Sequence, residues 1–183
     1  MNTPAKIIIH HTAVSRAKAP VQFQAVNRYH KELWNYESEL GLYGGYHLFI
    51  EADGTVLRYR NDHEVGAHTI GENNRSIGIC LSGNFDVEMP TTAQVNALRK
   101  LLIELVTKYP RILYKDIFPH RQFANKTCYG MNLANDWASK LASTVPTVDE
   151  VHEAELLAKV SKFDVPRDMV LRLIRAIISS RKK

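Results

Sequence analysis

The sequence predicts an α/β domain over residues 1–143 and a small helical annex over residues 144–183. Three observations support this division. Short β-branched runs alternate with longer segments whose apolar residues recur at helical spacing. A hairpin signal lies between two of the short runs. Residues 144–147, Thr-Val-Pro-Thr, are typical of a linker, and two further helical patterns follow them. A chain of 183 residues is long enough for one domain with such an appendage.

The first half of the domain predicts four strands and one helix. Lys6–His11 begins as a continuous apolar, β-branched run, which is typical of a strand covered on both faces. Residues 20–37 carry apolar side chains at helical spacing, and Pro20 suits the first turn of a helix. Residues 46–50 and 56–60 flank an Asp-Gly pair, which predicts a β-hairpin. Residues 76–83 predict another central strand.

The second half predicts a long helix, a last strand and a short helix. Thr91 and Gln94 have the spacing of a capping box, so they predict a helix that begins there and ends before Pro110. Residues 112–118 resemble a strand, residues 120–131 a loop, and residues 133–142 a short helix. The annex contributes two more helical patterns, at about 148–162 and 166–180.

Composition excludes several classes of protein. No stretch approaches the ~20 apolar residues of a membrane-spanning helix. Two cysteines do not make a disulfide framework. The N-terminus runs directly into an apolar strand and lacks the features of a secretory signal, so we expect the protein to be made in the cytoplasm.

The basic character of the chain lies in its C-terminal tail. Residues 167–183 hold six basic residues and one acidic residue, an excess that equals the net charge of +5 of the whole chain. The last helical pattern is amphipathic, with arginines on one face. Such a tail suggests an anionic partner such as a wall polymer, lipopolysaccharide, membrane headgroups or nucleic acid. The apolar face of the same helix can dock on the catalytic domain or pair with the preceding helix, which would leave the arginines solvated. Because the two faces differ, we expect docking together with electrostatic attraction.

One loop carries two residues suited to a metal. His120 and Cys128 are eight positions apart, and a loop of that size can turn both side chains toward one point. A catalytic zinc site usually has three protein ligands and one open position. The third ligand would come from elsewhere in the fold, and His10 or His11 at the end of the first strand is best placed. Because the chain has eight histidines, chance triplets are the competing explanation.

Four motifs in a fixed order make the evidence specific. The first is the strand Ile-Ile-Ile with His10, one variable residue, then Thr-Ala. The others are Gly-Tyr-His-Leu-Phe-Ile with Asp-Gly-Thr at 45–55, Val-Gly-Ala-His with Asn and Ser-Ile-Gly-Ile at 65–79, and His-Arg with Lys-Thr-Cys at 120–128. Over residues 5–142 the chain resembles the type-2 N-acetylmuramoyl-L-alanine amidases, which include phage endolysins and peptidoglycan recognition proteins. The resemblance implies a central mixed β-sheet flanked by helices.

The resemblance also implies which residues hold zinc. His10, His120 and Cys128 match the three zinc ligands of the family, whereas His11 falls where the family varies. Zinc lowers the pKa of water to about 7, which provides a nucleophile at neutral pH, and it polarises the amide carbonyl. One departure is Tyr129, because the family commonly has proline after the third ligand. We therefore expect a looser loop around Cys128.

Four further positions match residues of the family's active-site groove. Tyr46 and Lys126 match catalytic residues, and a lysine near a ligand suits the negative charge of a tetrahedral intermediate. The sequence does not decide which of the two transfers the proton. His68 and Asn73 match positions near the substrate, so we expect them to contact it.

The expected function is that of a phage-type endolysin, which splits the amide between N-acetylmuramic acid and the L-alanine of the stem peptide. By this resemblance the enzyme would act on the cell wall after release from the cytoplasm. A cytosolic amidase that recycles wall fragments is one alternative, but that branch tends to have aspartate as its third ligand. A non-catalytic peptidoglycan-binding module is another, but such proteins typically lack the cysteine. Some small phage amidases also bind an RNA polymerase. The sequence contains no feature that supports that partner here, and none that reports the oligomeric state.

Overall fold

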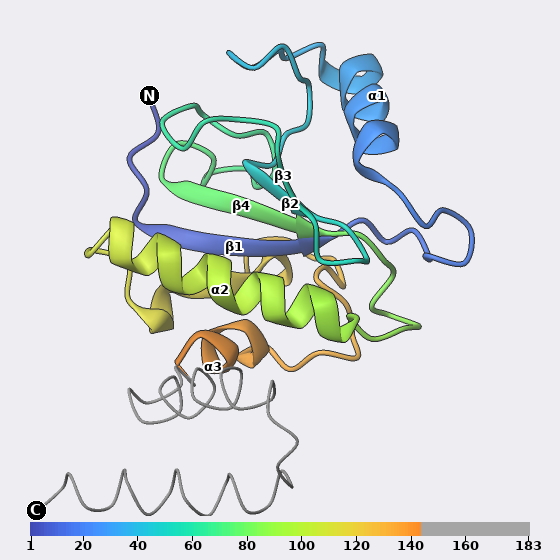
Figure 1. Cartoon of the computed structure of the whole chain (residues 1–183). Coiled ribbons are helices and arrows are strands. Elements are labelled where there is room, and N and C mark those ends of the chain that lie inside the picture. Colours follow the sequence, from blue (N-terminus) through green and yellow to red (C-terminus); the bar gives the residue numbers. More distant parts are fainter. Residues whose placement is uncertain (144–183) are drawn as a thin grey trace, which may run out of the picture. The chain divides into compact units, whose positions relative to one another are not determined.

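A computed structural model describes residues 1–143, which form one compact α/β unit around a five-stranded sheet (Figure 1). The predicted linker, helical annex and basic tail at 144–183 lie outside the described residues, so the domain division remains a prediction. Among the described helices, none is long and apolar enough to cross a membrane.

The sheet is mixed, as expected from the resemblance, and its strand order is β3-β2-β4-β1-β5. Its strands are β1 (Lys6–His11), β2 (Leu48–Ile50), β3 (Val56–Arg58), β4 (Ser76–Leu81) and β5 (Ile117–Pro119). Strand β1 pairs in parallel with both β4 and β5, and β2 pairs in parallel with β4. Only β3 is antiparallel, because it returns from β2 through the predicted Asp-Gly hairpin. The carboxyl ends of β1, β4 and β5 therefore meet at one edge of the sheet.

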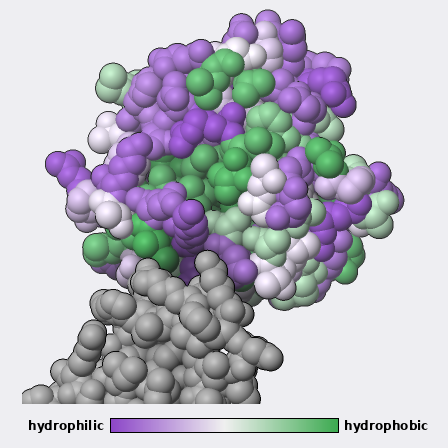
Figure 2. Space-filling model, viewed as in Figure 1, coloured by the Kyte–Doolittle hydropathy of each residue, from purple (hydrophilic) through white to green (hydrophobic). Residues whose placement is uncertain are grey.

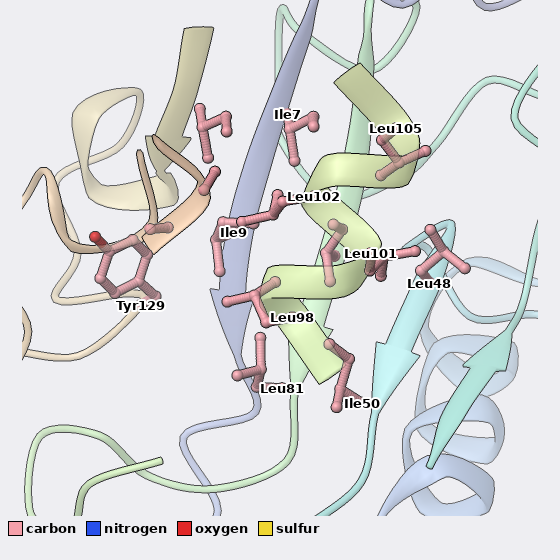
Figure 3. Close-up of a cluster of buried hydrophobic side chains, with 14 of the residues drawn as sticks. Ile7, Ile9, Leu48, Ile50, Leu81, Leu98, Leu101, Leu102, Leu105 and Tyr129 are labelled. Carbon is pink, nitrogen blue, oxygen red and sulfur yellow. The ribbon is translucent and has the colours of Figure 1, made fainter. Parts of the chain in front are cut away.

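Helix α2 (Thr92–Lys108) covers one face of the sheet (Figures 1 and 3). It begins with the predicted capping box, in which Thr91 and Gln94 each accept a hydrogen bond from the other's backbone N–H. Figure 3 shows its leucines meeting Ile7 and Ile9 of β1 in the main hydrophobic core. Helix α3 (Trp137–Ser143) adds Ala138 and Ala142 to the same core. Hydrophilic side chains and hydrophobic patches alternate on the surface seen from this side (Figure 2).

Helix α1 (Phe23–Trp34) packs on the opposite face with a smaller core of Phe23, Phe49, Tyr59 and Cys80. The Glu51 carboxylate at the end of β2 accepts hydrogen bonds from the backbone N–H groups of Gln22 and Phe23, at 2.8 and 2.7 Å. This contact satisfies donors that a helix N-terminus otherwise leaves free. Cys80 is fully buried there and packs in this core.

Several predicted elements are longer than the observed ones: the strands predicted at 46–50, 56–60 and 76–83 each lose two residues, and three other elements differ more. The helix predicted at 20–37 begins only at Phe23, where Glu51 caps it, and ends at Trp34, because the next residue, Asn35, has a left-handed φ of 46°. The strand predicted at 112–118 is mostly a turn: a 3-10 helix, η1 (Tyr114–Asp116), precedes the short strand β5. The helix predicted at 133–142 starts at Trp137. The start of α1 depends on a contact with Glu51, which is distant in the sequence and which periodicity alone does not report.

Candidate active site

The register of the sheet brings His10 and His120 together. His10 is the fifth residue of β1, and Ile9 pairs with Pro119 of β5. His120 comes next after Pro119 and opens the 3-10 helix η2 (His120–Gln122). The two imidazole rings lie 4.4 Å apart between centroids. Residues 110 positions apart in the sequence therefore become neighbours because two parallel strands end at the same edge.

The loop after η2 returns Cys128 to the same point. The Cys128 sulfur lies 3.7 Å from Nδ1 of His10, and it accepts a hydrogen bond from the backbone N–H of His11 at 3.5 Å. One donor atom from each of His10, His120 and Cys128 lies within 4.8 Å of the others. The predicted triplet is thus a real cluster and not a chance set of histidines.

The donor set of this cluster suits zinc. Tetrahedral zinc has Zn–N bonds of about 2.05 Å and Zn–S bonds of about 2.3 Å, which place a nitrogen and a sulfur ligand about 3.6 Å apart. The observed 3.7 Å between His10 Nδ1 and Cys128 Sγ agrees with this spacing. Two imidazoles and one thiol also leave a fourth position open, as catalytic zinc sites do.

His11 faces away from the cluster, because successive side chains of a strand point to opposite faces. Its Nδ1 accepts a hydrogen bond from the backbone N–H of Phe85 at 3.0 Å, and its ring contacts the Phe85 ring in the main core. The strand geometry therefore resolves the choice between His10 and His11 that spacing left open.

The Cys128 loop is held firmly although it lacks the family's proline. Tyr129 is fully buried, and its hydroxyl donates a hydrogen bond to the carbonyl of Ala134 at 2.7 Å. Asp86 accepts hydrogen bonds from the Thr127 hydroxyl and from the backbone N–H of Met131, at 2.9 and 2.8 Å. These contacts clamp the loop on both sides of Cys128. The buried Tyr129 ring and the Asp86 carboxylate thus supply the restraint that proline would provide.

Burial keeps the three donors uncharged. It lowers the pKa of His10 well below the ordinary value, and the neighbouring His68 and His120 lower this pKa further. Burial and the nearby Lys126 lower the pKa of His120 to about 4, and burial raises the pKa of Cys128 to about 12. Neutral imidazoles have a free lone pair for a metal, whereas the thiol must release its proton on binding. The site is therefore suited to a cation that can stabilise the thiolate.

Tyr46 and Lys126 stand beside the cluster. The Tyr46 ring lies 5.0 Å from the His10 ring, and burial, with the neighbouring Cys80 and Cys128, raises the pKa of its hydroxyl well above the ordinary value. Tyr46 therefore keeps its proton at neutral pH and acts as a hydrogen-bond donor. Lys126 is exposed on the Cys128 loop, and its charge lowers the pKa of His120 and of Cys128.

A cleft of about 1030 Å³ gathers every metal, catalytic and substrate-binding residue that the sequence predicted. Its lining includes His10, Tyr46, His68, Asn73, His120, Lys126 and Cys128. Tyr36, Ile70 and Phe123 also line the cleft, and no motif in the sequence predicted them. Ile70 is 97% exposed in the structure. In the sequence, the only sign of this position was an apolar residue within an otherwise polar loop. Trp34, the last residue of α1, also lies at the cleft and is 46% exposed.

Asn73 shapes the cleft wall from within. Its side-chain oxygen accepts hydrogen bonds from the backbone N–H groups of His68 and Thr69, at 2.9 and 2.8 Å. This contact fixes the loop that carries His68. The roles predicted for His68 and Asn73 in binding substrate remain predictions.

Comparison with known proteins agrees with this geometry. A family model described as N-acetylmuramoyl-L-alanine amidase matches residues 1–131. The endolysin of Klebsiella phage KP32 is 34% identical over 136 residues, which cover 71% of this chain and 83% of that protein. Peptidoglycan-recognition protein SC2 of Drosophila melanogaster is 31% identical over 133 residues, 70% of each. The solved N-acetylmuramoyl-L-alanine amidase LysC from Clostridium intestinale is similar with a TM-score of 0.60 and 33% identity, over 72% of this chain and 79% of that one.

Proposed function

The chain belongs to the N-acetylmuramoyl-L-alanine amidase family and is a peptidoglycan hydrolase with amidase activity, and from this premise we propose that it is a zinc enzyme. We further propose that it cuts the amide between N-acetylmuramic acid and the L-alanine of the stem peptide. The observation that carries the proposal is the cluster of His10, His120 and Cys128 in the lining of the cleft.

In this proposal His10, His120 and Cys128 hold the metal. Zinc bound there would supply Lewis acidity, which lowers the pKa of water toward neutrality and polarises a carbonyl. The His11 backbone N–H donates to the Cys128 sulfur and so stabilises the thiolate form. The half-buried position of Cys128 leaves the cleft side of the cluster open to substrate.

Tyr46 and Lys126 act on the scissile amide. As the amide is attacked, negative charge develops on its carbonyl oxygen, and the Lys126 ammonium is the nearby cation that stabilises it. Tyr46 holds its proton and donates a hydrogen bond from its hydroxyl to the reacting oxygen atoms. His68 and Asn73 form part of the wall against which the stem peptide would lie.

The cellular role that we propose is that of a phage-type endolysin, which reaches the wall after release from the cytoplasm. The support is the similarity to phage endolysins over 83% of the length of one of them. Cys128 supports this role over that of a recycling amidase, which tends to have aspartate as the third ligand, and over that of a wall-binding module, which typically lacks the cysteine.

Removal of the metal provides the first test. We expect the purified protein to contain about one zinc ion per chain. Elemental mass spectrometry measures this content. Dialysis against a chelator should abolish the clearing of purified cell walls, and stoichiometric zinc should restore it. Magnesium should not restore the clearing, because it prefers six oxygen ligands. Clearing by a preparation verified to be free of metal would contradict the proposal.

A further inference from the structure

The second nitrogen of His10 points away from the metal cluster. While Nδ1 faces the Cys128 sulfur, Nε2 lies 3.1 Å from Nδ1 of His68 and 3.4 Å from the Thr69 hydroxyl. The contact with His68 is the shorter of the two and lies within the range of a good hydrogen bond. The two rings meet edge to face, with centroids 5.1 Å apart and an interplanar angle of 86°.

The contacts around His68 favour one arrangement of its protons. The Ser76 hydroxyl donates to the backbone carbonyl of Glu72 at 2.7 Å, and a carbonyl can only accept. The Ser76 oxygen is therefore free to accept from Nε2 of His68, which lies 3.5 Å away. With its proton on Nε2, a neutral His68 offers a lone pair on Nδ1. This lone pair faces both the Thr69 hydroxyl, at 3.0 Å, and Nε2 of His10, at 3.1 Å. When His10 donates from Nε2, its own Nδ1 lone pair is left directed at the cluster.

The backbone around His68 is shaped to hold the ring in this place. A Cβ atom on Gly78 would lie 2.6 Å from Cδ2 of His68, and one on Gly66 would lie 2.5 Å from the same atom. Any side chain at either position would displace the imidazole. Gly78 belongs to the central strand β4, so the ring rests directly on rigid backbone. The backbone N–H of His68 donates to the Asn73 side chain, which fixes the loop that carries His68.

We propose that His68 is a positioning residue for the metal: its Nδ1 accepts the Nε2 proton of His10 and thereby selects Nδ1 of His10 as the metal ligand. The inference rests on the proposed zinc site. It gives His68 a role beyond substrate contact, because its acceptor nitrogen is engaged with His10. A histidine ligand whose other N–H is bound by a fixed acceptor is oriented and made more basic, which strengthens metal binding.

Two variants of nearly equal shape separate this role from simple packing. His68→Asn places an amide oxygen near the position of Nδ1, whereas His68→Leu has a similar shape but no acceptor. We expect His68→Leu to weaken zinc binding about 10–100-fold, the usual cost of losing such a partner. His68→Asn should bind zinc within a few-fold of the wild type. The measurement is competition for zinc against a chromophoric chelator. His63→Leu is the matched control, because the side chain of His63 is 53% exposed and bonds to Glu39.

The outcomes distinguish the inference from the proposed function. If the wild type itself holds no zinc, the proposed function fails at its metal. If the wild type holds zinc and His68→Leu holds it equally well, only the role of His68 is overturned. If both variants keep the zinc affinity but raise KM, His68 is a substrate contact, and its role in positioning the metal ligand is overturned.

A second measurement needs no variant. Nitrogen-15 NMR of the zinc-loaded wild type reports the tautomer of each histidine. We expect the proton on Nε2 of both His10 and His68. A proton on Nδ1 of His68 would reverse the hydrogen bond and overturn the inference.

Discussion

Replacement of Cys128 by serine is expected to empty the metal site and to reduce wall hydrolysis to the level of the metal-free protein. A serine hydroxyl is neutral at this position, whereas the cysteine binds as thiolate. The loss of zinc affinity should exceed the ~10–100-fold that loss of an outer hydrogen bond costs. Zinc content and release of soluble wall fragments are the two measurements. Circular dichroism reports whether the fold persists, as Tyr129 and Asp86 hold the loop independently of the sulfur.

The second cysteine provides the control. Cys80→Ala removes a thiol that is fully buried in the smaller core and is not one of the three clustered donors. It should keep about one zinc per chain. If Cys128→Ser also kept its zinc and its rate, the cluster would not be the metal site and the proposed ligands would be wrong.

Loss of Lys126 or of the Tyr46 hydroxyl should slow the reaction without emptying the site. We expect Lys126→Ala and Tyr46→Phe each to lower kcat by about 10²–10³-fold, the range for groups that stabilise an oxyanion or assist proton transfer. Neither side chain is a metal donor, so the zinc content should not change. Steady-state rates on a soluble muropeptide, measured with the zinc content of the same samples, test both expectations.

Matched variants outside the cleft isolate this effect. Lys100 is an exposed lysine on α2, and Tyr29 is 60% exposed on α1. Lys100→Ala and Tyr29→Phe should leave kcat unchanged. Loss of zinc from Lys126→Ala or Tyr46→Phe would show instead that the residue supports the metal site.

The sequence predicts the parts of this fold that local patterns determine. The capping box at Thr91 and Gln94 and the Asp-Gly hairpin are found as expected, because each depends on residues close together in the chain. Boundaries set by distant contacts are missed. The start of α1 depends on Glu51, almost 30 positions away, and hydrophobic periodicity carries no record of such a contact.

The active site also has features that local motifs predict and features that depend on distant contacts. Ordered motifs identify seven residues that the structure brings to one cleft, yet they do not report which histidine nitrogen faces the sulfur. The choice between His10 and His11 requires the direction of side chains along β1. The contact between His10 and His68 joins residues 58 positions apart, and its direction depends on a backbone carbonyl at Glu72. Backbone geometry of this kind has no signature in the residue types.

The chemical identity of the products tests the central claim most directly. Purified peptidoglycan of known composition is digested to completion, and the fragments are separated and analysed by tandem mass spectrometry. Cleavage of the proposed amide predicts stem peptides that begin with a free amino group on L-alanine, together with glycan chains whose N-acetylmuramic acid carries a free lactyl carboxylate. New reducing sugar ends, or free amino groups only at peptide cross-links, would show that another bond is cut and would contradict the account.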